Sequence, residues 1–307
     1  MYDMNFEVDN IATYCEWSKI THLFVTCLAV RYGKVVINDI HDNSLASAST
    51  YMNMITGLKR TYPNLRIVLV FDHVYLSSVQ KAIDINSTAF FTSLSQQVIK
   101  YSADGIELDF NILTEYNRDS SRIALVLCES GIRGKLFLTI GGNVDLNSIY
   151  NCNILNLFGA LCAYVIVNSF GFFQYDHLFL KHGKIKLMKA ASECDHFDTV
   201  WAIEKVIKIV PASKVLLGLA SEGVVFTKNG KYVTNVYETS FKDIRVYERQ
   251  NIESDIGMYI SYDNLQSRLK KFTYIDQYGL KGVVCGDIWH DTPPKSADCL
   301  LNIALDL

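Results

Sequence analysis

The sequence of 307 residues predicts an α/β fold, a (β/α)8 TIM barrel with a small insertion between strand 7 and strand 8. Two observations support this prediction. Short, almost continuous apolar runs alternate with helix-length segments, a pattern typical of parallel strands that helices cover on both faces. About eight such units fit into the chain, as a closed barrel requires. The rival fold, a doubly wound open sheet, is disfavoured because no GxGxxG loop follows the first strand.

The predicted strands are the apolar runs themselves. Each is rich in Val, Ile, Leu and Phe and is short enough to be a buried strand rather than a helix. In chain order they span 21–30, 34–38, 66–71, 105–110, 135–140, 162–170, 214–220 and 282–288, of which 34–38 is the weakest.

Helices are predicted where apolar residues recur three and four positions apart and a helix breaker follows. Pro63 and Pro211 end two of these segments, and Gly279 ends a third. The predicted helices span 45–63, 88–103, 198–211, 264–279 and 296–307.

One segment, 222–258, interrupts the alternation of strands and helices. It is aromatic and polar, and its pattern indicates short strands. We therefore expect a single barrel over 1–307 that carries 222–258 as an inserted α+β segment rather than as a separately folding domain.

Composition excludes several classes of protein. Half of the residues are apolar and the formal net charge is −3, which is a globular composition. Without a basic excess, no nucleic-acid partner is expected. No apolar run reaches the roughly 18 residues of a membrane helix, and the first residues lack the basic and apolar regions of a signal peptide. The eight cysteines form no CxxC pair and are interpreted mainly as buried thiols, with one or two disulfides left open.

The fourth strand carries polar residues at every second position. In "ADGIELDFN" (103–111), Glu107, Asp109 and Asn111 alternate with apolar residues, so a strand places all three on one face. Two interpretations stay open. These residues form either a buried polar network or part of a ligand pocket.

Four segments together resemble a known family. They are "SKITHLFVTCLAV" (18–30), "YSADGIELDFN" (101–111), "VLLGLASEGVVFT" (215–227) and "GMYISYDNLQSRLKKFTYIDQYGLKGVV" (257–284). In this order and spacing, the chain resembles the family 18 glycoside hydrolases, the chitinases and chitinase-like proteins. The second segment is similar to the family's fourth-strand signature D-G-x-D-x-D-x-E.

The resemblance implies a chemistry that this chain lacks. Members hydrolyse β-1,4 links next to N-acetylglucosamine, with the last Glu as the acid and the middle Asp positioning the N-acetyl group, which itself attacks. Asp104 matches the opening of the signature, Glu107 stands at the first inner Asp, and Asp109 keeps the positioning Asp. Asn111 stands at the acid, and an amide has no proton to give. No catalytic residue is therefore expected in this degenerate motif.

Other family positions differ in the same pocket. The sixth strand usually reads M-x-Y-D, and its Tyr and Asp are replaced here by Phe170 and Gly171. The Trp of the eighth strand aligns with Gly286. The S-x-G-G of the third strand is replaced by "LVFDH", which ends in Asp72 and His73. Together with Asn111, these losses indicate that the hydrolytic site is gone.

Residues remain that could hold a ligand. Trp289 is the best candidate for stacking on a sugar ring. The ligand-binding candidates are Asp109, Asn111, Phe170, Asp287 and Trp289. A metal site is not expected, because Asp72, His73, Asp287 and His290 do not have ligand spacing. No cofactor is expected, and Ser169 lacks evident His and Asp partners for a hydrolase triad.

These observations favour a chitinase-like pseudoenzyme with a binding or signalling role, whose partner is a chito-oligosaccharide, another glycan or a protein. Two alternatives stay open. One is a divergent active glycosidase with a relocated acid, for which Glu107, Glu115 and Asp287 are candidates. The other is a structural or assembly protein. The resemblance implies secretion, whereas no signal peptide is visible, so the localisation stays open.

Overall fold

The computed structural model describes most of the chain. The described residues are 15–37, 48–71, 76–110, 136–141, 149–169, 199–219, 221–229, 232–240, 258–263, 265–286 and 299–305, with 244, 291 and 296. The chain folds into two compact units. The first comprises Met1–Ile140 and Asn147–Val165, and the second comprises Gly141–Leu146 and Ile166–Leu307.

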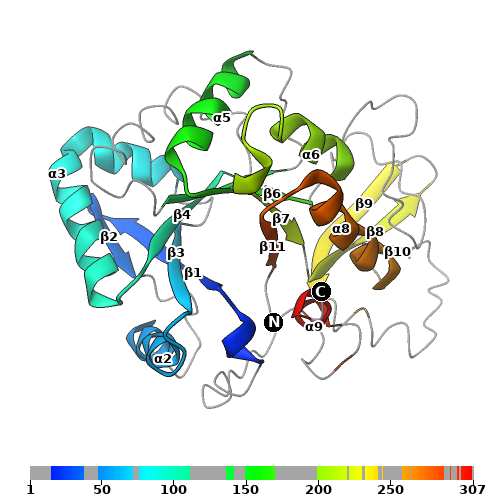
Figure 1. The fold of residues 1–307 in the computed structure, drawn as a ribbon. Coiled ribbons are helices and arrows are strands. Elements are labelled where there is room, and N and C mark those ends of the chain that lie inside the picture. Colours follow the sequence, from blue (N-terminus) through cyan, green and yellow to red (C-terminus); the bar gives the residue numbers. More distant parts are fainter. Residues whose placement is uncertain are drawn as a thin grey trace. The chain divides into compact units, whose positions relative to one another are not determined.

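The first unit is built on a mainly parallel sheet with helices beside it (Figure 1). The strand order is β2-β1-β3-β4-β5, and the backbone N–H of Ala163, just before β6, donates to Leu136 O of β5 (2.7 Å). The strands are β1 (His22–Arg31), β2 (Lys34–Ile37), β3 (Arg66–Phe71), β4 (Gly105–Phe110), β5 (Leu136–Gly141) and the beginning of β6 (Tyr164–Asn168). The helices are η2 (Trp17–Lys19), α2 (Ala48–Thr61), α3 (Leu76–Lys100) and α5 (Ile149–Leu161).

Continuous apolar strands are buried in this unit, as predicted. In β3 every residue after Arg66 is buried, because this strand lies between two parallel neighbours and both of its faces are covered. The predicted bounds of β3 and β4 match the structure, and those of the other described strands agree to within three residues. Helix α5 was not predicted.

The segment 34–38 is confirmed as a strand but is not a parallel unit of the barrel. β2 pairs antiparallel with β1, with Leu28 opposite Ile37. Only Tyr32 and Gly33 connect the two strands, and a parallel crossover needs a dozen residues or more. Both connecting residues have positive φ angles, 53° and 74°, as a tight hairpin turn requires.

Helix α3 is longer than predicted and is broken in its middle. Asn86 has φ −158° and ψ 84°, so two helices meet there. Its side-chain Oδ1 accepts a hydrogen bond from the Ala89 N–H (2.9 Å), which is an N-cap for the second half. The predicted helix 88–103 corresponds to this second half, and the first half from Leu76 was missed.

The second unit contains the end of β6 and two further parallel strands in the order β6-β7-β11. They are β7 (Val215–Leu219) and β11 (Gly282–Cys285), paired from Leu216 opposite Gly282 to Leu219 opposite Cys285. The predicted continuation of the last strand over 287–288 lies outside the described residues. The accompanying helices are α6 (Thr199–Val206), η4 (Ala212–Lys214), α8 (Leu265–Tyr278) and α9 (Leu300–Leu305).

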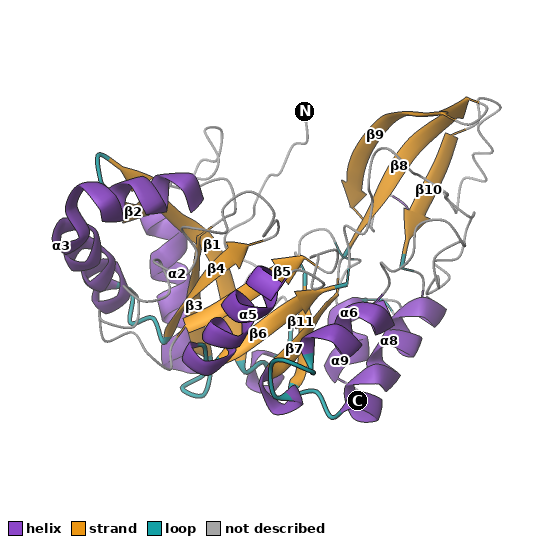
Figure 2. Ribbon diagram, turned by 90° about the horizontal axis from the view of Figure 1, so that it is seen from above, coloured by secondary structure: helices purple, strands orange, loops and turns teal. Residues whose placement is uncertain are grey.

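An insertion follows β7 within the second unit. Strands β8 (Glu222–Asn229), β9 (Tyr232–Ser240) and β10 (Met258–Tyr262) form an antiparallel sheet in the order β10-β8-β9. Figure 2 shows this sheet as separate from β7 and β11 of the same unit. The predicted strands of 222–258 are present and extend to Tyr262. The expectation that 1–307 form one barrel domain with this segment inserted stays a prediction.

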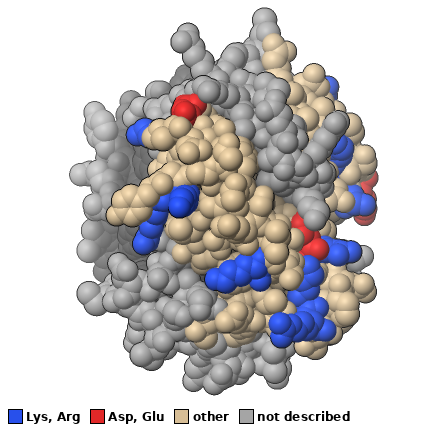
Figure 3. Space-filling model, turned by 90° about the vertical axis from the view of Figure 1, so that its left-hand side faces the viewer, with Lys and Arg blue, Asp and Glu red and all other residues tan. Residues whose placement is uncertain are grey.

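The described surface of the first unit carries more cations than the net charge of −3 suggests. In Figure 3, Lys and Arg side chains predominate over Asp and Glu. The exposed cations of this unit include Arg31, Lys34, Arg60, Arg66, Lys81 and Lys100. The chain as a whole is acidic, and the absence of a nucleic-acid partner stays a prediction.

Candidate functional site

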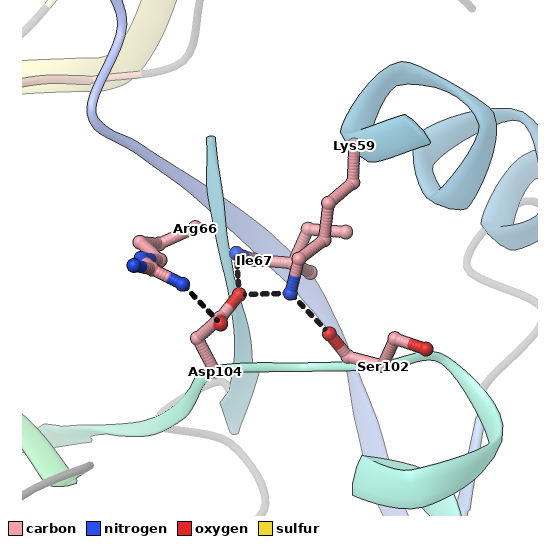
Figure 4. A network of polar contacts seen from close by, with 5 residues as sticks. All are labelled: Lys59, Arg66, Ile67, Ser102 and Asp104. Atoms are coloured by element: carbon pink, nitrogen blue, oxygen red, sulfur yellow. Dashed lines mark hydrogen bonds and ion pairs between the residues drawn. The ribbon is translucent and has the colours of Figure 1, made fainter. Parts of the chain in front are cut away.

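The candidate site is built on β4, whose first motif residue serves the fold. Asp104 precedes the strand, at the end opposite to the one where barrel enzymes carry their sites. Its Oδ2 accepts hydrogen bonds from Lys59 Nζ (2.5 Å) and the Ile67 N–H (2.9 Å), and its Oδ1 accepts one from Arg66 (3.2 Å). Lys59 also donates to Ser102 O (2.6 Å), as Figure 4 shows.

These contacts determine the charge state of Asp104. Its partial burial alone would raise the pKa, but hydrogen bonds from Lys59 and Ile67 and the charge of Lys59 outweigh that effect and lower the pKa. Asp104 is therefore an anion at neutral pH that connects α2, the beginning of β3 and the turn before β4. We therefore assign Asp104 a structural role.

Glu107 lies on the face of β4 that the sequence predicts to be polar. It is 6% exposed and accepts a hydrogen bond from the Thr139 hydroxyl of β5. In the register, Glu107 stands opposite Phe137, and Asp109 stands opposite Thr139. Glu107 is therefore buried and hydrogen-bonded to the neighbouring strand, while the choice between a polar network and a ligand pocket for Glu107, Asp109 and Asn111 stays a prediction.

Aromatic rings of the first unit pack together nearer the beginning of the strands. The Phe137 ring lies 5.5 Å from His22, 5.3 Å from Phe24 and 5.6 Å from Tyr164, measured between ring centroids. Burial and the nearby charge of Arg66 lower the pKa of His22, so its ring is neutral at neutral pH. Tyr164, which is partly buried at the beginning of β6, therefore packs against this group of rings.

Most of the predicted site residues lie outside the described part of the chain. Asp109 belongs to β4, but nothing beyond its position and register is described. Outside the described residues lie Asp72, His73, Asn111, Glu115, Phe170, Gly171, Asp287, Trp289 and His290. Among the residues that the structure describes, no group of three or more His, Cys, Asp and Glu side chains could hold a metal ion.

In the second unit, a buried network lies at the end of β6. Ser169 is 3% exposed, and its hydroxyl donates to Gly218 O of β7 (2.7 Å). Lys271 Nζ of α8 donates to Ser169 O (3.1 Å), to Ser169 Oγ (3.2 Å) and to Asp263 Oδ2 (2.5 Å). The partners of Ser169 are thus a lysine and a carbonyl, with no histidine among the described contacts, which makes it a poor hydrolase nucleophile.

The same strand ends approach each other closely at Asn168. A Cβ added to Gly218 would lie 2.5 Å from Oδ1 of the buried Asn168, so a larger residue there would require the amide to move. Asn168 begins the stretch that the resemblance aligns with M-x-Y-D.

A second buried ion pair fixes the last helix. Arg268 of α8 donates to Asp291 Oδ1 (3.1 Å), and both side chains are almost fully buried. Asp291 Oδ2 accepts the backbone N–H of Leu300 (2.6 Å), which begins α9. Sequence reasoning missed both ion pairs. The available signal was the spacing of Arg268, Lys271 and Phe272 by three and four residues, which places two charges on the buried stripe of a helix.

Cysteines in the described part of the chain include Cys15, Cys27, Cys162, Cys285 and Cys299, of which Cys27, Cys285 and Cys299 are free thiols. Among them, Cys27, Cys162 and Cys299 are buried, which agrees with their interpretation as small apolar residues. No described helix is long and apolar enough to cross a membrane.

Comparison with known proteins identifies a family and a fold. The family model described as "Glycosyl hydrolases family 18" matches residues 1–291. The search of curated proteins found no matching sequence. Solved structures do match, and the family match together with them confirms the predicted TIM barrel with its insertion.

The matching structures include a pseudo-chitinase, a chitinase-like agglutinin and a chitinase. Human YKL-39, described as a pseudo-chitinase with retained chitooligosaccharide binding properties, has a TM-score of 0.76 at 15% identity, over 99% of this chain and 95% of that chain. The chitinase-like agglutinin of Robinia pseudoacacia has a TM-score of 0.71 at 17% identity (96% and 95%). The class V chitinase of Nicotiana tobaccum, solved in complex with NAG4, has a TM-score of 0.74 at 14% identity (99% and 96%).

Proposed function

Since the chain belongs to the glycosyl hydrolases of family 18, we propose that it is a chitinase-like pseudoenzyme that binds chito-oligosaccharides or a related glycan without hydrolysing them. Binding would serve recognition or signalling. The ligand would lie at the carboxyl ends of the barrel strands, where barrels of this kind carry their sites.

One observation carries the proposal. Asn111 directly follows Phe110, the last residue of β4, and stands where the resemblance implies the catalytic acid. Cleavage of a glycosidic bond requires a proton for the leaving oxygen, and an amide cannot supply it. An amide can still donate a hydrogen bond to a sugar oxygen, so the position remains suitable for binding.

Further residues support the loss of hydrolysis. Phe170 lacks the hydroxyl and Gly171 the carboxylate that the resemblance implies at the end of β6. Gly286 replaces the Trp of the eighth strand, and its N–H donates to Leu219 O (2.5 Å), which continues the pairing of β11 with β7. The remaining groups for a sugar are Asp109, Asn111, Phe170, Asp287 and Trp289.

Similar proteins support binding without turnover as a coherent function. Human YKL-39 is described as a pseudo-chitinase that retains chitooligosaccharide binding. The agglutinin from Robinia pseudoacacia is described as chitinase-like. At identities of 15% and 17% these likenesses transfer the fold alone, so the ligand of this chain rests on its own residues.

The alternative function is a divergent active glycosidase that uses an acid at another position. One contact, at Glu107, supports this alternative. Glu107 is buried on the polar face of β4 beside Thr139, two residues before Asp109. In a divergent enzyme this carboxyl, Glu115 or Asp287 would donate the proton that Asn111 cannot. Turnover that disappears in the variant Glu107→Gln would support such an enzyme.

The test combines two assays on the same purified chain. We expect no hydrolysis of a fluorogenic chitotrioside, and heat of binding when chito-oligosaccharides of increasing length are titrated. The variant Asp109→Asn should weaken binding by about tenfold, which is one hydrogen bond to a charged group. Lys81→Met, on the exposed surface of α3, is the matched control and should bind like the parent.

The outcomes separate the three functions. Turnover by the parent chain would refute the pseudoenzyme. Binding without turnover would support it. A chain that neither binds nor hydrolyses glycans would point to the assembly role, and a search for a protein partner would follow. The variant Asn111→Glu alone should remain inactive, because Phe170 and Gly171 still lack the groups that contact the reacting sugar.

A further inference from the structure

A surface feature of the first unit has no part in the proposed glycan site. The break in α3 lies at Asn86, and the side chains of Asn86, Ser87 and Thr88 are exposed. They form the one N-x-S/T acceptor sequence of the chain. Such sequences are modified when they lie on accessible surface in a secreted protein.

We propose that Asn86 is an N-glycosylation site, so that this chain carries a covalently attached glycan. The reaction joins Asn86 Nδ2 to C1 of an N-acetylhexosamine from a lipid-diphosphate-linked oligosaccharide. The C1–O bond to the diphosphate breaks, the lipid diphosphate leaves, and the amide nitrogen loses one proton. This inference does not depend on the proposed function.

The geometry at Asn86 suits a modified side chain. Asn86 is extended rather than helical, with φ −158°, and its Oδ1 caps the second half of α3 through the Ala89 N–H (2.9 Å). Glycosylation changes only Nδ2 and leaves Oδ1 as an acceptor. The folded helix can therefore keep its cap and carry a sugar on the same side chain.

The neighbouring surface also suits a covering group. Ile85 directly precedes the acceptor, and its side chain is 82% exposed. A sugar attached at Asn86 would lie beside Ile85 and shield it from water.

The described cysteines are compatible with an oxidising secretory compartment. Burial raises the pKa of the Cys27 thiol to about 12, and burial with the nearby Asp291 carboxylate raises that of Cys299 to about 11. The thiolate is the form that exchanges disulfides, so these thiols are protected although they are free.

The test is peptide mapping of the full chain isolated from the cells that make it. Trypsin cleaves after Lys81 and Lys100, so residues 82–100 form one peptide. We expect this peptide to carry N-acetylhexosamine, and peptide N-glycosidase to remove it and leave an aspartate at position 86. An unmodified peptide from these cells would overturn the proposal.

Two matched variants separate the modification from the cap. Thr88→Ser keeps an acceptor sequence, whereas Thr88→Ala destroys it, and both leave the Asn86 cap intact. Expressed in the same cells, Thr88→Ser should keep the glycan and Thr88→Ala should lose all of it. A glycan that persists in Thr88→Ala would show that Asn86 is not the acceptor.

Discussion

The buried ion pair between Lys271 and Asp263 gives the sharpest test of the second unit. The variant Lys271→Met keeps most of the side-chain volume and removes the ammonium group. Three hydrogen bonds disappear, to Asp263 Oδ2 and to the hydroxyl and carbonyl of Ser169. Asp263, which is 4% exposed, is left without its cation, and its other oxygen has no hydrogen-bond partner in the described part of the chain.

The expected cost follows from that uncompensated charge. Removing one partner of a buried pair costs about 3–5 kcal/mol of unfolding free energy, and Asp263→Leu should cost a similar amount. The double variant Lys271→Met with Asp263→Leu removes both charges, so it should lie within about 1 kcal/mol of the parent, because buried apolar pairs replace buried ion pairs at little cost. The coupling energy of the cycle should therefore be several kcal/mol.

The assay is urea unfolding, followed by circular dichroism and by hydrogen exchange of the β6, β7 and α8 amides. Exchange is needed because the chain has two compact units, and these can unfold in separate steps. Lys270→Met changes an exposed neighbour on the same helix, whose cation lies 5.6 Å from the Tyr274 ring, and should cost no more than about 1 kcal/mol. A Lys271→Met variant as stable as Lys270→Met, with no coupling to Asp263, would refute the reasoning.

Three further predictions concern the fold around the site. Asp104→Asn should lower the unfolding free energy at pH 7 by about 1–2 kcal/mol. Because the pKa of Asp104 is lowered on folding, its contribution is present above the unfolded pKa of about 3.9 and is lost as pH falls through the folded pKa. The difference between variant and parent in a pH series of urea titrations must therefore shrink in acid, and a constant difference would contradict this. Ser102 has a φ of 50°, in the left-handed region that glycine adopts more easily. Ser102→Gly should therefore raise the free energy of unfolding by about 1 kcal/mol, and with it the melting temperature. A lower melting temperature would contradict backbone strain at Ser102. Gly218→Ala should lower the free energy of unfolding by about 1–3 kcal/mol, because the added methyl group clashes with Asn168. The control Gly57→Ala lies in a helix with open space around it and should raise the free energy of unfolding by about 0.5–1 kcal/mol. Equal melting temperatures of the two variants would contradict the close approach at Gly218.

The strands could be predicted from sequence because burial on both faces leaves a local signal. The run 66–71 is apolar except at its first residue, and β3 has the same bounds. The hairpin of β2 was misread as a parallel unit of the barrel, although the two-residue connection at Tyr32 and Gly33 already excluded a crossover. Loop length was therefore the missed signal.

Helices were predicted less well where their period is weak. Helix α5 (Ile149–Leu161) is apolar on most sides, so no stripe marks it. The first half of α3 was missed for lack of a clear apolar face. The missed signal was Asn86 itself, because an Asn just before a helical run is a cap signal.

The sequence predicted which residues of β4 share a polar face, but it did not predict the hydrogen bonds that these residues make. Period two on β4 placed Glu107 and Asp109 on one side of the strand. The hydrogen bond from Thr139 depends on the register of two strands that lie 32 residues apart. The bond between Lys271 and Ser169 spans 102 residues, and no local pattern encodes it.

Asp104 shows why a partly matching signature says little about activity. The residues of this chain that match the opening of the signature precede the polar face, and the carboxylate of Asp104 is held by Lys59, Arg66 and the Ile67 N–H at the beginning of the strands. These contacts give Asp104 a structural role that requires no contact with a substrate. The resemblance implies an acid at the other end of β4, where this chain has Asn111. A chain that needs the barrel but not the reaction would retain the first residue and would be free to change the last, which is the combination found here.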